Sequence, residues 1–118
     1  DRLESVMELT QATKNICTLV QTVSDFLHDE GVDWDPDGDP ILYYDPEEWE
    51  ERGELYGLES ELIMAYDGNI MFYIMNPGYS ANPTNAYEMH DRFVDKLHAV
   101  GFWVEPCTHW YAAFYPVD

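Results

Sequence analysis

Acidic side chains offer the clearest chemistry in this sequence, and one group of them has the spacing of a calcium loop. In the stretch DWDPDGD, Asp33, Asp35 and Asp37 stand at alternate positions and a glycine follows. Carboxylates spaced in this way can turn toward one hard cation, and the glycine permits the sharp turn of an EF-hand loop. The position that needs a bidentate Glu is occupied by Tyr44. A solvated turn is therefore favoured, Ca²⁺ binding by these three residues is the weaker hypothesis, and no cofactor is predicted.

Negative charge is concentrated in one part of the chain. Residues 29–61 contain fourteen of the 24 acidic residues and one Arg, so this segment carries −13 of the net charge of −19. Between Asp45 and Glu54, six of ten residues are acidic. On a helix that rises about 1.5 Å per residue, this is one charge per about 2.5 Å, whereas duplex DNA carries one per about 1.7 Å and each strand one per about 3.4 Å. Such a density on one face is suited to a groove that binds a phosphate backbone.

We therefore predict that the acidic segment binds a basic partner protein through carboxylates, with aromatic side chains adding apolar contact between them. The predicted carboxylates are Asp33, Asp35, Asp37, Asp39, Asp45, Glu47, Glu48, Glu50, Glu51 and Glu54, and the aromatic residues are Trp34, Tyr43, Tyr44 and Trp49. In size and composition, though in no motif, the chain is similar to phage-encoded DNA-mimic inhibitors. That similarity implies an anti-defence protein that occupies the nucleic-acid channel of a nuclease, a restriction system or a CRISPR effector complex, as anti-CRISPR proteins do.

Catalytic signatures are missing from the sequence. It has no HExxH, G-x-S-x-G, GxGxxG or P-loop pattern. Carboxylate pairs such as Asp91 with Asp95 have the chemistry of a general acid and base, but so many acids occur that the spacing carries little information. The four histidines are scattered, at positions 28, 90, 98 and 109. We predict that the protein is not an enzyme.

The charge also restricts the partners and the compartment. A net charge of −19 repels nucleic acid and anionic membranes, so direct binding to either is not expected. There is no apolar run near 18 residues, and no signal or lipidation motif. The two cysteines, Cys17 and Cys107, stand in unrelated contexts, which favours a reducing cytoplasm. For a phage-encoded protein this is the cytoplasm of the bacterial host.

Two alternatives share these electrostatic features. One is an immunity protein for a basic toxin nuclease, which blocks a single cognate enzyme. The other is a haloadapted acidic domain of unrelated function, in which acids should cover every exposed face. The neutral polar positions Gln11, Asn15, Gln21 and Ser24 in the first helix argue against haloadaptation. The acidic inhibitor is therefore the preferred hypothesis.

The elements that must position the acidic segment begin with a long amphipathic helix over residues 3–28. Its apolar stripe has spacings of three and four residues, and it favours a helix that covers a sheet, although the same stripe can form a homodimer. The stripe contains Val6, Leu9, Thr13, Ile16, Val20, Val23 and Leu27, widened by Ala12, Leu19 and Phe26. Residues 32–46 are predicted to be irregular, and DPEEWEERG to form a short helix between Pro46 and Gly53.

The second half of the chain predicts a hairpin, a helix and one or two strands. Asp67-Gly68 is typical of a type I′ turn, which pairs Ala65 with Ile70 and directs Ile63 and Ala65 toward the long helix. The next helix is predicted to start at a capping box formed by Asn85 and Glu88. This order of elements predicts a single α+β domain over residues 1–118, with two helices packed on a small antiparallel sheet.

Overall fold

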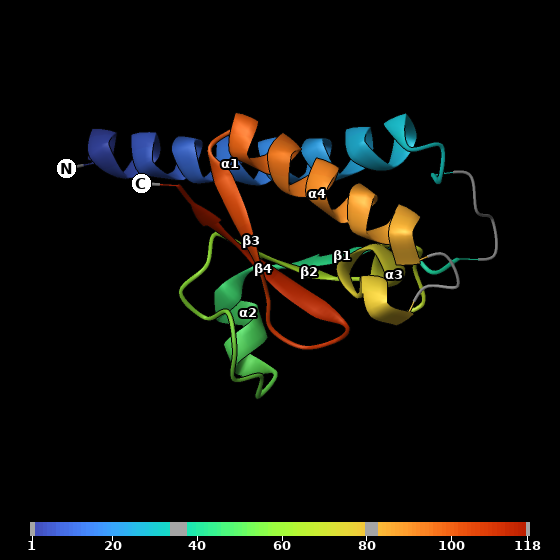
Figure 1. Cartoon of the computed structure of the whole chain (residues 1–118). Coiled ribbons are helices and arrows are strands. Elements are labelled where there is room, and N and C mark those ends of the chain that lie inside the picture. The colour runs from blue at the N-terminus through green and yellow to red at the C-terminus, as the bar shows by residue number, and fades with distance from the viewer. Residues whose placement is uncertain (1, 34–37, 80–82, 118) are drawn as a thin grey trace.

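A four-stranded antiparallel sheet, in the order β1-β2-β4-β3, lies between helices on its two faces (Figure 1). The computed structural model describes residues 2–33, 38–79 and 83–117. The elements are α1 (Arg2–Asp29), β1 (Leu42–Tyr44), α2 (Pro46–Glu51), β2 (Leu62–Ala65), α3 (Met71–Met75), the 3-10 helix η1 (Pro77–Tyr79), α4 (Pro83–Ala99), β3 (Phe102–Pro106) and β4 (Tyr111–Pro116). This architecture confirms the predicted α+β fold class with a small antiparallel sheet.

Helices α1 and α4 cover one face of the sheet, and the rings of Phe26 and Phe93 meet between them with centroids 5.0 Å apart (Figure 1). The buried core of this layer contains Leu19, Val23, Phe26 and Leu27 of α1, Met71, Ile74 and Met75 of α3, Met89, Phe93 and Leu97 of α4, and Leu62, Met64, Tyr66, Phe102, Ala112 and Phe114 of the sheet and its margin. The predicted long helix is therefore present. Among the stripe residues from position 11 onward, Ala12 and Thr13 are exposed, and the first fully buried one is Leu19.

The opposite face of the sheet is covered by α2 and by the segment 52–61 that follows it (Figure 1). The smaller core on this side contains Trp49, Ile63, Ala65, Tyr111 and Ala113. The predicted orientation of β2 is therefore wrong, since Ile63 and Ala65 face α2 instead of the long helix. Leu62 and Met64 face α1 and α4, because neighbouring residues of a strand point to opposite sides of the sheet.

The predicted hairpin around Asp67-Gly68 is also wrong. Residues 71–75 form helix α3, and β2 pairs with β1 and β4 instead. The Asn69 side chain favours the helix, because its Oδ1 accepts a hydrogen bond from the backbone N–H of Met71 at 2.9 Å. Ile70, Met71, Ile74 and Met75 then lie on one helical face toward the larger core.

Two further boundaries differ from prediction. Leu42–Tyr44 form the edge strand β1 within the segment that was expected to be irregular. Helix α4 begins at Pro83, so Asn85 lies inside the helix and not at its N-cap. The final segment forms two strands, β3 and β4, and Pro106 is the last residue of β3.

Two ion pairs join the C-terminal end of α1 to α4. The Nε and Nη2 atoms of Arg92 donate to the two carboxylate oxygens of Glu30, each at 2.7 Å. The Nζ atom of Lys96 donates to the carboxylate of Asp29. These hydrogen bonds lower the pKa values of Glu30 and Asp29. Both pairs therefore stabilise the fold above the ordinary carboxyl pKa, and this contribution is lost as the pH falls through the lowered values.

We expect the double variant Arg92→Met with Lys96→Met to be less stable than the wild type at neutral pH, and the difference to shrink in acid. Urea denaturation of both proteins between about pH 3 and pH 7 measures it, because the stabilisation begins to be lost once the pH falls to the ordinary carboxyl pKa of about 4. Comparison at each pH removes the change in charge repulsion that the two proteins share. A difference that stays constant across the range would contradict the pairing.

Gly57 allows the segment after α2 to lie directly on the sheet. Its φ of +80° suits glycine. A Cβ at this position would lie 2.8 Å from Cδ1 of Ile63 and 3.0 Å from Cβ of Ala113. Gly53 has a similar φ of +90°, but a Cβ there would meet nothing within 4 Å. Comparing an alanine substitution at each of the two glycines therefore separates the cost of backbone strain from the cost of steric overlap with the core.

We expect Gly57→Ala to lower the free energy of unfolding by about 1–3 kcal/mol more than Gly53→Ala does, because only the first variant overpacks the core. Both variants have a comparable cost from the left-handed backbone. Urea denaturation measures the two losses side by side. Equal losses would show that the segment 52–61 does not lie as close to the sheet as the structure indicates.

Candidate partner-binding surface

Helix α2 has the local sequence of a well-defined short helix. The Asp45 carboxylate caps it by accepting a hydrogen bond from the backbone N–H of Glu47 at 2.7 Å. Pro46 stands at the first helical position, where its missing N–H has no cost. The helix ends before Gly53, whose N–H donates to the carbonyl of Glu50 at 2.9 Å. The predicted helix between Pro46 and Gly53 is confirmed.

Trp49 attaches α2 to the sheet. Its side chain is fully buried. Its ring centroid lies 4.7 Å from that of Tyr44, 4.9 Å from that of Tyr111 and 5.6 Å from that of Trp110. These rings come from β1, from β4 and from the residue before β4. The centre of the acidic helix is thereby held against two strands.

The burial of Trp49 determines where the acidic side chains of α2 point. Successive residues of a helix are rotated by about 100°. Glu48 and Glu50 therefore extend to the two sides of the helix, and Glu47 and Glu51 extend away from the sheet. All four are exposed, as is Asp45. We call these five residues the α2 surface; its charges are spread around the helix instead of lying on one face.

Repulsion among these glutamates is smaller than the gain from burying Trp49. Three pairs of glutamates are three or four residues apart, and each such like-charge pair destabilises a helix by roughly 0.2–0.5 kcal/mol. Loss of a buried Trp side chain typically costs about 3–5 kcal/mol. Aromatic packing therefore holds the charged helix in place despite its repulsion.

Among the described residues, no cation of the chain forms an ion pair with a carboxylate of the α2 surface. Between the described residues the ion pairs are His28–Asp33, Arg92–Glu30 and Lys96–Asp29, and none includes a residue of α2. Arg52 directly follows the helix, but its guanidinium carbon lies 4.8 Å from the ring centroid of Tyr44 and 4.7 Å from that of Trp49. Arg52 therefore covers the aromatic cluster, and the glutamates face solvent.

Of the other predicted carboxylates within the described residues, Asp33 lies at the end of α1, away from α2, whereas Asp39 lines a cleft with Arg52, the residue that follows α2. Asp33 is exposed and its Oδ2 lies 2.9 Å from Nδ1 of His28, which raises the pKa of that histidine mainly through the hydrogen bond. Asp39 is exposed and its backbone N–H donates to the carbonyl of Gly68 at 3.0 Å. In Figure 1 the C-terminal end of α1 and the helix α2 lie at different ends of the molecule.

Several predicted contact residues are buried or lie outside the described residues. The prediction that Trp49 offers apolar surface between the charges is wrong, because the side chain is inside the smaller core. Tyr43 packs against the larger core, and its burial raises its pKa. Tyr44 and Glu54 are half-buried. Trp34, Asp35 and Asp37 lie outside the described residues.

The calcium hypothesis rests on Asp33, Asp35 and Asp37. Because Asp35 and Asp37 lie outside the described residues, it stays a hypothesis. Within residues 2–33, 38–79 and 83–117, no group of three His, Cys, Asp or Glu side chains is arranged to hold a metal ion.

Burial raises the pKa of the Cys107 thiol to about 11, so this cysteine is protonated at neutral pH.

A cleft of about 300 Å³ adjoins the aromatic cluster, between the edge strand β1 and Arg52. Its lining combines Leu42 and Trp110 with Arg52 and the carboxylates of Asp39 and Asp67. Sequence reasoning did not assign Arg52 or Asp67 to a site. Their proximity comes from the pairing of β1 with β2, which no local pattern in the sequence indicates.

Comparison with protein-family models, curated proteins and solved structures found no match for this chain. Among the helices that the structure describes, none has the length and apolar character needed to span a membrane.

We expect Trp49→Ala to lower the free energy of unfolding by about 3–5 kcal/mol, because it removes the largest side chain of the smaller core. Urea denaturation measures this loss. Trp103→Ala is the matched control, since Trp103 is 39% exposed; its loss should be clearly smaller. If the two substitutions were equally costly, Trp49 would not be the anchor of α2.

Proposed function

We propose that this protein is a non-enzymatic inhibitor that binds the basic, nucleic-acid-binding surface of another protein and excludes nucleic acid from it. The nuclease, restriction system or CRISPR effector complex of a phage host is the class of partner that fits best. The observation that carries the proposal is the α2 surface, whose five exposed carboxylates are held on a fixed helix and have no cationic partner among the described residues.

The arrangement of the chain's own cations supports this function. Arg92 and Lys96 pair with acids at the end of α1, and Arg52 lies over aromatic rings. Acids that served only to stabilise the fold would gain from such pairing, whereas the carboxylates of α2 stay available for a partner. Each exposed pair contributes only about 0–1 kcal/mol, so affinity has to come from several contacts together.

The uneven distribution of charge favours a docking surface over haloadaptation. The described part of α1 carries neutral polar side chains that bond along the helix: Gln11 Nε2 donates to Oδ1 of Asn15 at 3.0 Å, and Gln21 Nε2 donates to Oδ1 of Asp25 at 2.8 Å. A coat of acids selected for high salt would extend over this exposed face as well. The carboxylates of α2 lie on the opposite side of the sheet from α1 (Figure 1).

We expect the tagged protein to capture a nucleic-acid-binding protein from host lysate, and duplex DNA or RNA to displace it. The quadruple variant E47Q/E48Q/E50Q/E51Q should lose this capture, because it removes the charges and keeps the buried Trp49. The matched control is the quadruple variant D25N/E88Q/D91N/D95N, which uses only exposed acids of α1 and α4 and makes the same change in net charge on the other side of the sheet. Quantitative mass spectrometry measures capture by the three proteins.

Each outcome of this experiment decides between the hypotheses. Equal capture by the two quadruple variants would reject the α2 surface as the contact. Capture that persists in saturating nucleic acid would reject mimicry and favour an immunity protein that binds beside the substrate channel. Raising the salt from about 0.1 to 0.5 M should weaken a true complex mainly by slowing its association.

A further inference from the structure

An aromatic pair at the β3 edge of the sheet lies apart from the α2 surface. Trp103 and Tyr115 are cross-strand partners in β3 and β4. Their rings are stacked, with centroids 4.8 Å apart and an angle of 22° between the planes. Trp103 remains 39% exposed and Tyr115 is half-buried. Their strand neighbours Phe102 and Phe114 point into the larger core, so the pair lies on the same face of the sheet as Trp49.

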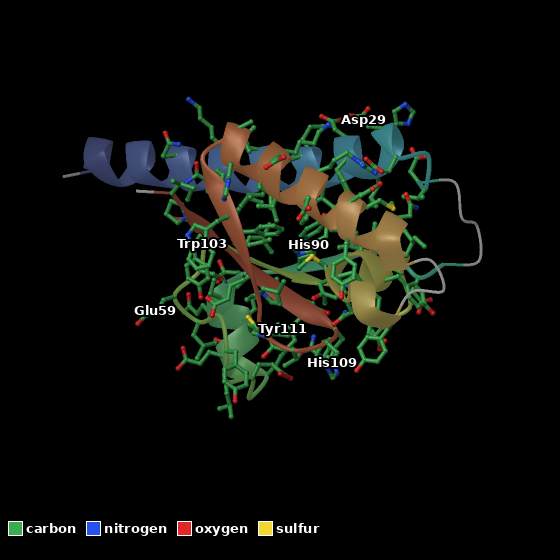
Figure 2. All side chains as sticks on the ribbon, in the orientation of Figure 1. Asp29, Glu59, His90, Trp103, His109 and Tyr111 are labelled. Carbon is green, nitrogen blue, oxygen red and sulfur yellow. The ribbon has the colours of Figure 1, made fainter. Side chains whose placement is uncertain are left out.

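Two carboxylates border this pair. Glu105 is exposed and lies two residues after Trp103 on the same strand, and therefore on the same face. Glu59 belongs to the segment after α2, and Figure 2 shows it on the same side of the molecule as Trp103. Burial, and then the charges of Glu105 and Glu59 among others, raise the pKa of Tyr115. Both carboxylates therefore act on the edge of the stacked pair.

None of the cations that the structure describes lies over Trp103 or Tyr115. Arg92 and Lys96 form their ion pairs with acids of α1 and the residue after it, and Arg52 covers Tyr44 and Trp49. Arg52 also shows, on this same face of the sheet, how the chain accommodates a guanidinium against aromatic rings. The stacked pair offers a second aromatic surface of this kind, with carboxylates beside it and none of the described cations on it.

We propose that Trp103, Tyr115, Glu59 and Glu105, which we call the Trp103 surface, form a docking site for an arginine side chain of the basic partner protein. A guanidinium stacks on the indole face and donates paired hydrogen bonds to a carboxylate, whereas a lysine ammonium is a compact and strongly hydrated point charge. The site therefore selects arginine over lysine. The identity of the partner rests on the proposed function, but the chemistry of the surface can be tested without that partner.

Titration of ¹⁵N-labelled protein with a blocked tetra-arginine peptide tests the site. The probe signal is the indole N–H resonance of Trp103, identified by its absence in Trp103→Phe. We expect a saturable shift, with tetra-lysine of equal charge binding about two- to fivefold more weakly. The variant E59Q/E105Q should raise the Kd for tetra-arginine about fivefold. The control E47Q/E50Q, with the same change in net charge, should alter the Kd at Trp103 by less than about twofold.

An unmoved Trp103 signal, or equal binding of the two peptides, would overturn the proposal. So would an equal effect of the two double variants, because binding would then depend on total charge alone. These outcomes are separate from those of the capture experiment. If the capture experiment fails while the Trp103 surface binds arginine selectively, the docking site stands and the proposed class of partner is rejected. If capture succeeds but the Trp103 surface does not bind arginine selectively, only the Trp103 surface is rejected.

Discussion

The burial of Trp49 against the sheet is the interaction on which the charged half of the molecule depends. A six-residue helix with four glutamates has little stability of its own, because short helices are marginal in water. Its central side chain packs among Tyr44, Trp110 and Tyr111, and this contact outweighs the repulsion between the glutamates. Because one residue is fixed in this way, the directions of the acidic residues around it follow from helix geometry.

The small number of cations imposes a second constraint. With five Lys and Arg residues against 24 acids, the chain can neutralise few of its charges. It uses Arg92 and Lys96 to join α4 to the end of α1, and it places Arg52 on the aromatic cluster. The acids of α2 therefore remain unpaired among the described residues, which is the property expected of a surface that receives a basic protein.

The two faces of the sheet carry different kinds of surface. One face, under α1 and α4, carries the larger core and provides stability. The other face carries the smaller core, the acidic helix and the exposed pair of Trp103 and Tyr115. The α2 surface and the Trp103 surface therefore lie on the same side of the sheet, which is consistent with one basic partner, of the class that we propose, contacting both of them.

The sequence by itself determined the α+β class, the long amphipathic helix, the concentration of charge and the limits of α2, because periodicity, capping and composition depend on residues that are close together in the chain. Only the tertiary structure decided that β2 pairs with β1 and β4, that residues 71–75 form a helix, and that Trp49 is buried while Trp103 is exposed. An apolar strand can bury either face and pair with any compatible edge. The choice depends on packing between segments that are distant in sequence, and no local pattern encodes it.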